Sequence, residues 1–195
     1  ERKINLLAFG NQICSFLNMS LAHLLGTTPH LSPLLRKARR LGYATPDDLQ
    51  RLAVLRGCFH YGLPEDQSNA VEDCGQDRLS NEELTVALVS AASDGEAQHI
   101  RVAAQLLGAP GLHAASVARL ARMERCVPII RYIAKAGLRE DEAGADFWKA
   151  LLQLLPMCEP IAEGRMPHPS RFLSQPGWTP RSRPQRRTSW LRAHA

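Results

Sequence analysis

The chain has 195 residues, of which 45% are hydrophobic, and its formal net charge is +5 at pH 7. This length suffices for one well-buried core that folds without disulfide staples. The charge is uneven: seven arginines and no acidic residue follow Glu163, whereas residues 1–163 carry 17 basic and 19 acidic groups, a net charge of −2. The basic isoelectric point is therefore no evidence for a nucleic-acid-binding face on the folded body.

Composition also argues against a secreted or membrane protein. The five cysteines are odd in number and unclustered, which indicates reduced thiols and a cytoplasmic location. The apolar stretch of residues 4–17 is interrupted by Asn5, Asn11 and Gln12, so it predicts neither a signal peptide nor a membrane span. We therefore expect no membrane partner.

In chain order, apolar residues recur with helical spacing and the alternation typical of half-buried strands is nearly absent, which predicts an all-α fold. Thr45 is a candidate N-cap, and Ser80 with Glu83 has the spacing of a capping box. Left-handed caps are expected at the glycines that follow apolar helical runs, which are Gly26, Gly42, Gly108 and Gly137. The expected helices cover residues 4–25, 31–41, 46–58, 80–92, 96–107, 114–125, 128–136 and 145–155.

The C-terminal part has a different composition. Proline and glycine dominate from Pro156 onward, which predicts a helical domain over residues 1–163 and an irregular Arg/Pro-rich arm over residues 164–195. Large apolar groups near a folded body usually find a groove, so we expect Phe172 and Trp178 to dock on the helical domain. The segment from Arg181 to Arg192 is expected to be exposed and to contribute little to stability.

Two stretches of the chain read almost alike. Residues 38–42, 51–53 and 58 match residues 104–108, 119–121 and 126. This pattern predicts an internal duplication of a helical hairpin, with repeat units at 31–61 and 97–132, and a short solenoid of such hairpins. The alternative is an irregular bundle whose alanine- and leucine-rich helices match by chance. Under the duplication, Leu52 and Leu120 occupy equivalent buried positions.

Two segments have the small-residue and turn-glycine pattern of a helix-turn-helix. The first covers residues 20–32 and the second begins at Ala104, with its second helix carrying His113, Ser116 and Arg119 as the only base-reading side chains. Pro33 falls inside the second helix of the first candidate. The alternative for both is a packed helical corner in which the glycine is a cap.

Catalytic and metal-binding patterns are weak. Cys58, His60 and Cys74 are zinc-ligand types, but no fourth ligand lies at a tight spacing, and buried free thiols are the commoner role. Cys58 and His60 alternate on a helix and would point apart, which argues against a nucleophile pair. We predict no catalytic residue, no metal ligand and no cofactor.

Basic side chains are the candidate binding residues. Arginine and lysine suit an anionic partner, either a protein or a nucleic-acid backbone. We therefore expect a non-enzymatic helical interaction or scaffold module with a basic C-terminal arm. The alternatives are a helix-turn-helix DNA-binding transcriptional regulator and an enzyme whose site is assembled from distant residues. The candidate contacts are Arg36, Lys37, Arg39 and Arg40, followed in the arm by Arg181, Arg183, Arg186, Arg187 and Arg192.

Overall fold

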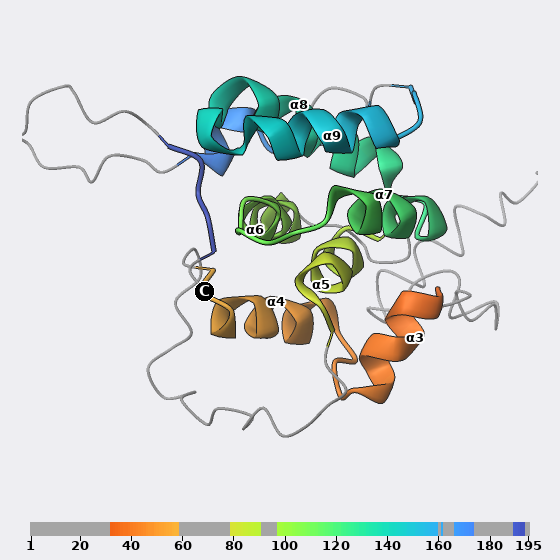
Figure 1. The fold of residues 1–195 in the computed structure, drawn as a ribbon. Coiled ribbons are helices and arrows are strands. Elements are labelled where there is room, and N and C mark those ends of the chain that lie inside the picture. Colours follow the sequence, from red (N-terminus) through yellow and green to blue (C-terminus); the bar gives the residue numbers. More distant parts are fainter. Residues whose placement is uncertain are drawn as a thin grey trace, which may run out of the picture. The chain divides into compact units, whose positions relative to one another are not determined.

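The computed structural model describes residues 32–58, 79–90, 97–159, 161, 166–173 and 189–193. Within these residues the chain is all-α, as predicted, and its one extended pairing is an isolated antiparallel bridge between Leu173 and Trp190 (Figure 1). The expected helix over residues 4–25 lies outside the described residues. The α-helices are α3 (Pro33–Arg40), α4 (Pro46–Leu55), α5 (Asn81–Leu88), α6 (Ala97–Leu107), α7 (Ala114–Met123), α8 (Val127–Glu140) and α9 (Ala145–Leu154), and the 3-10 turns are η2 (Glu142–Gly144) and η3 (Pro169–Phe172).

Both predicted N-caps are confirmed, and both are capping boxes. The Asp48 N–H donates to the Thr45 hydroxyl at 3.2 Å, and the Thr45 N–H donates to the Asp48 carboxylate at 2.9 Å. Ser80 and Glu83 exchange the same pair of bonds at the start of α5, at 3.1 and 2.9 Å. Each box satisfies backbone N–H groups that a first helical turn leaves without partners, so α4 and α5 begin where the sequence predicts.

Of the four glycines expected to form left-handed caps, Gly42 is confirmed by its φ of 93° just after α3, and Gly26 lies outside the described residues. Gly108 and Gly137 have another role. Helix α8 continues through Gly137 to Glu140. A Cβ atom at Gly137 would lie only 2.4 Å from Trp148 Cε2. At the end of α6, a Cβ atom at Gly108 would lie 2.6 Å from Trp190 Cδ1. Both positions therefore require glycine because an indole ring packs directly against the backbone.

Helix α5 lies at the centre of the described helices. It packs against α3, α4, α6 and α7 (Figure 1). Residues 84–90 are all buried. Helix α7 also contacts α8 and α9, which pair with each other. Removal of this apolar surface from water is the main favourable contribution to the fold. The described helices thus form a helical bundle within one compact unit, Ser32–Ala195.

The two stretches that read alike have the same local geometry at their second helix. Leu52 and Leu120 are each 6% exposed. Each helix is followed by a buried cysteine whose N–H donates to the carbonyl of an alanine five residues earlier, at 3.1 Å from Cys58 and 3.0 Å from Cys126. Within each expected hairpin, however, the two helices do not pack closely on one another, and all four contact α5 instead. The internal duplication stays a prediction.

The C-terminal residues dock on the helices in two places. Phe172, in η3, is buried, as predicted, whereas Trp178 lies outside the described residues. We name residues 189–193 the C-terminal strap. We expected this segment to be exposed, but Trp190 is only 4% exposed. Its ring centroid lies 5.1 Å from that of Trp148 and 5.5 Å from that of Phe172.

The strap supplies hydrogen-bond donors to the C-terminal end of α6. Trp190 Nε1 donates to the Ala104 carbonyl at 3.0 Å, and the Ala193 N–H donates to the Gln105 carbonyl at 3.2 Å. Both carbonyls also accept a hydrogen bond from the Gly108 N–H, at 3.2 and 3.1 Å, so the strap adds a second donor to each. These bonds, together with burial of the indole ring, explain why the strap docks there.

Replacement of either equivalent leucine should destabilise the protein. Leu52→Ala and Leu120→Ala are each expected to lower the free energy of unfolding by about 2–5 kcal/mol, because each leaves a cavity in the core. Leu55→Ala is the control, because Leu55 lies on the same helix as Leu52 and is 57% exposed. Urea denaturation followed by circular dichroism measures the effect. A loss in Leu120→Ala no larger than that in Leu55→Ala would contradict the assigned burial.

Removal of the Trp190 indole ring should also destabilise the protein. Trp190→Ala is expected to lower the free energy of unfolding by about 3–5 kcal/mol, because it removes a buried ring and its hydrogen bond to α6. Trp190→Phe keeps an aromatic ring and loses the hydrogen bond, so its expected loss is smaller. The same denaturation experiment compares the two variants. If Trp190→Ala were as stable as the unchanged protein, the strap would not be part of the fold.

Candidate anionic-partner interface

Helix α3 presents three arginines on its solvent-facing side. The Ser32 hydroxyl accepts a hydrogen bond from the Leu35 N–H at 3.2 Å and begins the helix, which then buries Leu34, Leu35 and Ala38. Successive residues of a helix are 100° apart, so the remaining positions face the other way. Arg36, Arg39 and Arg40 are exposed there, and their side chains form no hydrogen bond or ion pair with the described residues.

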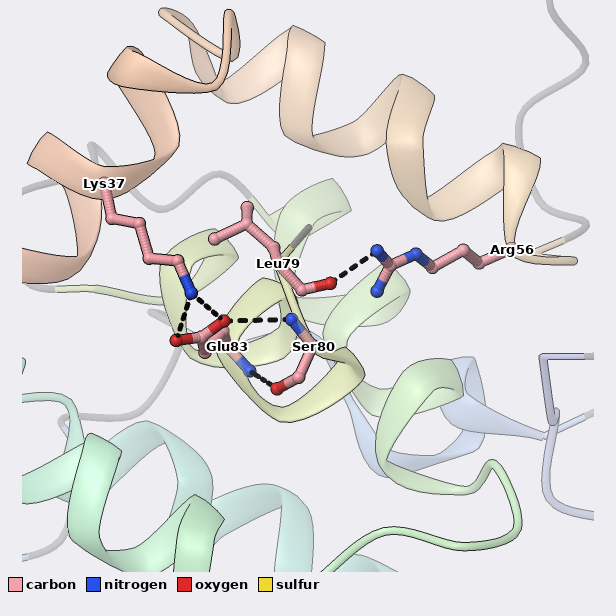
Figure 2. Close-up of polar contacts among 5 residues, drawn as sticks. All are labelled: Lys37, Arg56, Leu79, Ser80 and Glu83. Atoms are coloured by element: carbon pink, nitrogen blue, oxygen red, sulfur yellow. Dashed lines mark hydrogen bonds and ion pairs between the residues drawn. The ribbon is translucent and has the colours of Figure 1, made fainter. Parts of the chain in front are cut away.

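Lys37 differs from its three basic neighbours. Figure 2 shows it reaching from α3 to Glu83 on α5, where Nζ lies 2.9 Å from Oε1 and 2.8 Å from Oε2. The same Glu83 carboxylate accepts the capping hydrogen bond from the Ser80 N–H. Lys37 therefore ties α3 to the start of α5 and is committed to an internal contact. Nearby, Arg56 binds the Leu79 carbonyl and joins the end of α4 to the same region (Figure 2).

At its other end, α3 meets the end of α7. The Glu124 side chain is buried, and its carboxylate accepts hydrogen bonds from the Leu34 N–H at 3.2 Å and from the Ser90 hydroxyl at 3.0 Å. This contact joins the start of α3 to the end of α7, where Arg122 and Arg125 are exposed. These two arginines were not among the binding residues expected from the sequence. Their position on the polar side of the helix expected over residues 114–125 was the available signal.

The arginines predicted in the C-terminal arm fall into two groups. Arg192 is half-buried, binds the Gly108 carbonyl and forms an ion pair with the buried Asp141. Asp141 also accepts a hydrogen bond from Trp148 Nε1 at 2.8 Å. Arg192 is thus committed to an internal contact between α6 and the start of η2. The other predicted contacts, Arg181, Arg183, Arg186 and Arg187, lie outside the described residues.

The geometry of the second helix-turn-helix candidate argues against base reading by α7. The first candidate, residues 20–32, lies outside the described residues except for Ser32. In the second, α7 packs against α5, α8 and α9 rather than closely on α6. Glu82 Oε1 accepts a hydrogen bond from the His113 N–H at 3.1 Å, at the start of α7. A carboxylate therefore occupies the helix end that would have to approach DNA.

Hydrogen bonding keeps this Glu82 carboxylate charged. Burial opposes ionisation, but hydrogen bonds from the backbone N–H groups of Glu82 itself and of His113 outweigh it and hold the pKa of Glu82 below its ordinary value. The charge complements the positive N-terminal end of the α7 dipole, so it stabilises the fold.

The cysteines in the described part, Cys58, Cys126 and Cys158, are free thiols. Burial raises the pKa of Cys58 to about 12, and burial together with the charge of Glu124 raises that of Cys126 to about 12. Neither is a thiolate at neutral pH. Of the candidate zinc ligands, His60 and Cys74 lie outside the described residues, within which no group of three or more His, Cys, Asp or Glu residues could hold a metal ion.

No family model, curated protein or solved structure matches this chain. Among the helices that the structure describes, none has the length and apolar character needed to cross a lipid bilayer. The exposed arginines of α3, together with those at the end of α7, make up the candidate interface.

Loss of the Glu82 charge should change how stability depends on pH. The folded-state pKa lies below the ordinary value of 4.5, so this carboxylate stabilises the fold above that pH, and its contribution is lost as the pH falls through the folded-state pKa. We expect Glu82→Gln to be less stable than the unchanged protein at neutral pH and to lose less stability on acidification. Thermal melts from about pH 3 to about pH 7 measure this.

The control for this experiment is Glu142→Gln, which removes an exposed acid at the start of η2. Its melting profile should follow that of the unchanged protein. Identical melting profiles for Glu82→Gln and Glu142→Gln would show that the hydrogen bond from the His113 N–H to Glu82 contributes nothing to stability.

Proposed function

We propose that this protein is a non-enzymatic helical interaction module that binds an anionic partner through Arg36, Arg39 and Arg40. The observation that carries the proposal is the contrast within one helix. Lys37 pairs with Glu83, whereas the three arginines are exposed and have no partner among the described residues. Helix α3 itself contains no acidic residue, so their charges add on one face. An arginine face of this kind attracts carboxylates, sulfates and phosphates.

The alternative is a DNA-binding regulator that reads bases with α7. The Glu82 carboxylate at the start of α7 and the packing of that helix on three others support the α3 proposal instead. We further propose that the protein works in a reducing compartment such as the cytoplasm, in keeping with its free Cys58, Cys126 and Cys158.

The proposal is tested with a triple variant, Arg36→Gln/Arg39→Gln/Arg40→Gln, on a heparin column and in anisotropy titrations with a fluorescent nucleic-acid duplex. All three changes lie on the exposed side of α3, so the fold should persist, as circular dichroism can check. We expect elution at lower salt and a salt dependence of duplex binding that is shallower by roughly 2–3 log units per log unit of salt, because three cations no longer displace counterions.

A matched control separates a specific surface from total charge. Lys135→Gln/Arg139→Gln/Lys149→Gln removes the same number of positive charges from exposed positions on α8 and α9. It should elute close to the unchanged protein. Equal losses in the two triple variants, or no retention of the unchanged protein on heparin, would refute an anion-binding role for α3.

A further inference from the structure

Arg125 has an unusual backbone conformation. Its φ angle is 55°, and it is the only residue other than glycine with a positive φ among the described residues. Side chains with a Cβ atom are disfavoured in this left-handed region, whereas glycine adopts it readily. The corresponding turn after α4 has glycine at that point, since Gly57 has a φ of 86°.

The turn itself requires this conformation. After Arg125, the chain reverses so that the Cys126 N–H donates to the Ala121 carbonyl at 3.0 Å and the thiol is buried. After Gly57, Cys58 forms the same bond to Ala53 at 3.1 Å. Glycine would therefore serve the backbone better than arginine at position 125. The Arg125 side chain does not stabilise the described fold, because it is exposed and forms no hydrogen bond or ion pair there.

A strained residue whose side chain faces solvent points to a role outside the fold. Arg122 is exposed one turn earlier on α7, with its Nε donating to the Ala118 carbonyl. The bond from the Leu34 N–H to Glu124 brings the start of α3, and with it Arg36, to the same end of the bundle. Glu124 is the one acidic residue in residues 114–126, and its carboxylate is buried and hydrogen-bonded.

We propose that Arg36, Arg122 and Arg125 together bind backbone phosphates of a nucleic-acid duplex. This inference rests on the proposed anion-binding function and adds its partner and two further contacts. The guanidinium fork matches phosphate oxygens. A protein partner is less suited to this surface, because α3 and α7 carry no aromatic residue that could serve as a buried anchor. Contacts with duplex nucleic acid are instead mostly polar and cationic.

The decisive variant is Arg125→Gly, which copies the turn at Gly57. Because it relieves the strained backbone, we expect the melting temperature to stay the same or rise by up to about 2–4 °C. Affinity for a fluorescent duplex should fall by roughly fivefold at 0.15 M salt, because one phosphate contact is lost. For the same reason, the slope of log affinity against log salt concentration should become shallower by about 0.9. Such a loss of binding without a loss of stability separates a binding residue from a structural one.

Two controls accompany this variant. Arg125→Lys keeps the charge and the strained turn, so it should retain most of the binding. Lys149→Gln removes one exposed positive charge from α9 and should leave duplex affinity nearly unchanged. Polyglutamate, measured beside the duplex, represents an acidic protein partner.

The outcomes distinguish this inference from the proposed function. If the α3 triple variant weakens binding while Arg125→Gly does not, the anion-binding function stands and the phosphate site at Arg125 is wrong. If the unchanged protein binds polyglutamate but no duplex, the partner assigned here is wrong. If Arg125→Gly lowers the melting temperature by several degrees, the premise that arginine strains this turn is wrong.

Discussion

The buried Glu124 carboxylate holds three helix ends together. It accepts hydrogen bonds from the start of α3 and from Ser90, just beyond the end of α5, while its own backbone lies at the end of α7. A carboxylate is costly to bury, but here the N–H group and the positive dipole end of α3 compensate for part of that cost. Because the direction of α3 depends on this contact, so does the direction in which its arginines project.

A second buried carboxylate organises the opposite part of the bundle. Asp141 receives Trp148 from α9 and Arg192 from the C-terminal strap, and Arg192 also binds α6 at the Gly108 carbonyl. Both acids therefore join segments that are far apart in sequence. Replacing either one would leave several donors buried without partners, which costs more than the net gain from forming the same bonds.

The helices and their caps follow from local sequence, because periodicity, Thr45 and Ser80 act over a few residues. The strap does not, because Trp190 meets Ala104 across 86 residues and nothing local marks that contact. The candidate site shows the same limit. Nothing in the local sequence distinguishes Arg36 from Arg192 as a binding residue. Only the position of Asp141 in the fold gives Arg192 an internal partner, while Arg36 stays exposed. Lys37 was likewise expected to face a partner, but Glu83 lies beside it.

Because the strap lies late in the chain, the helices that it covers are synthesised well before their packing can be completed. Trp190 is added 86 residues after Ala104. At ribosomal rates of about 5–20 residues per second, that interval lasts about 4–17 s. During this time the end of α6 lacks the ring that later covers it, and so does the indole of Trp148 once that residue has been added. A nascent chain therefore exposes an aromatic surface that a chaperone could hold, and the α6 to α9 region reaches its final packing only after the strap emerges from the ribosome.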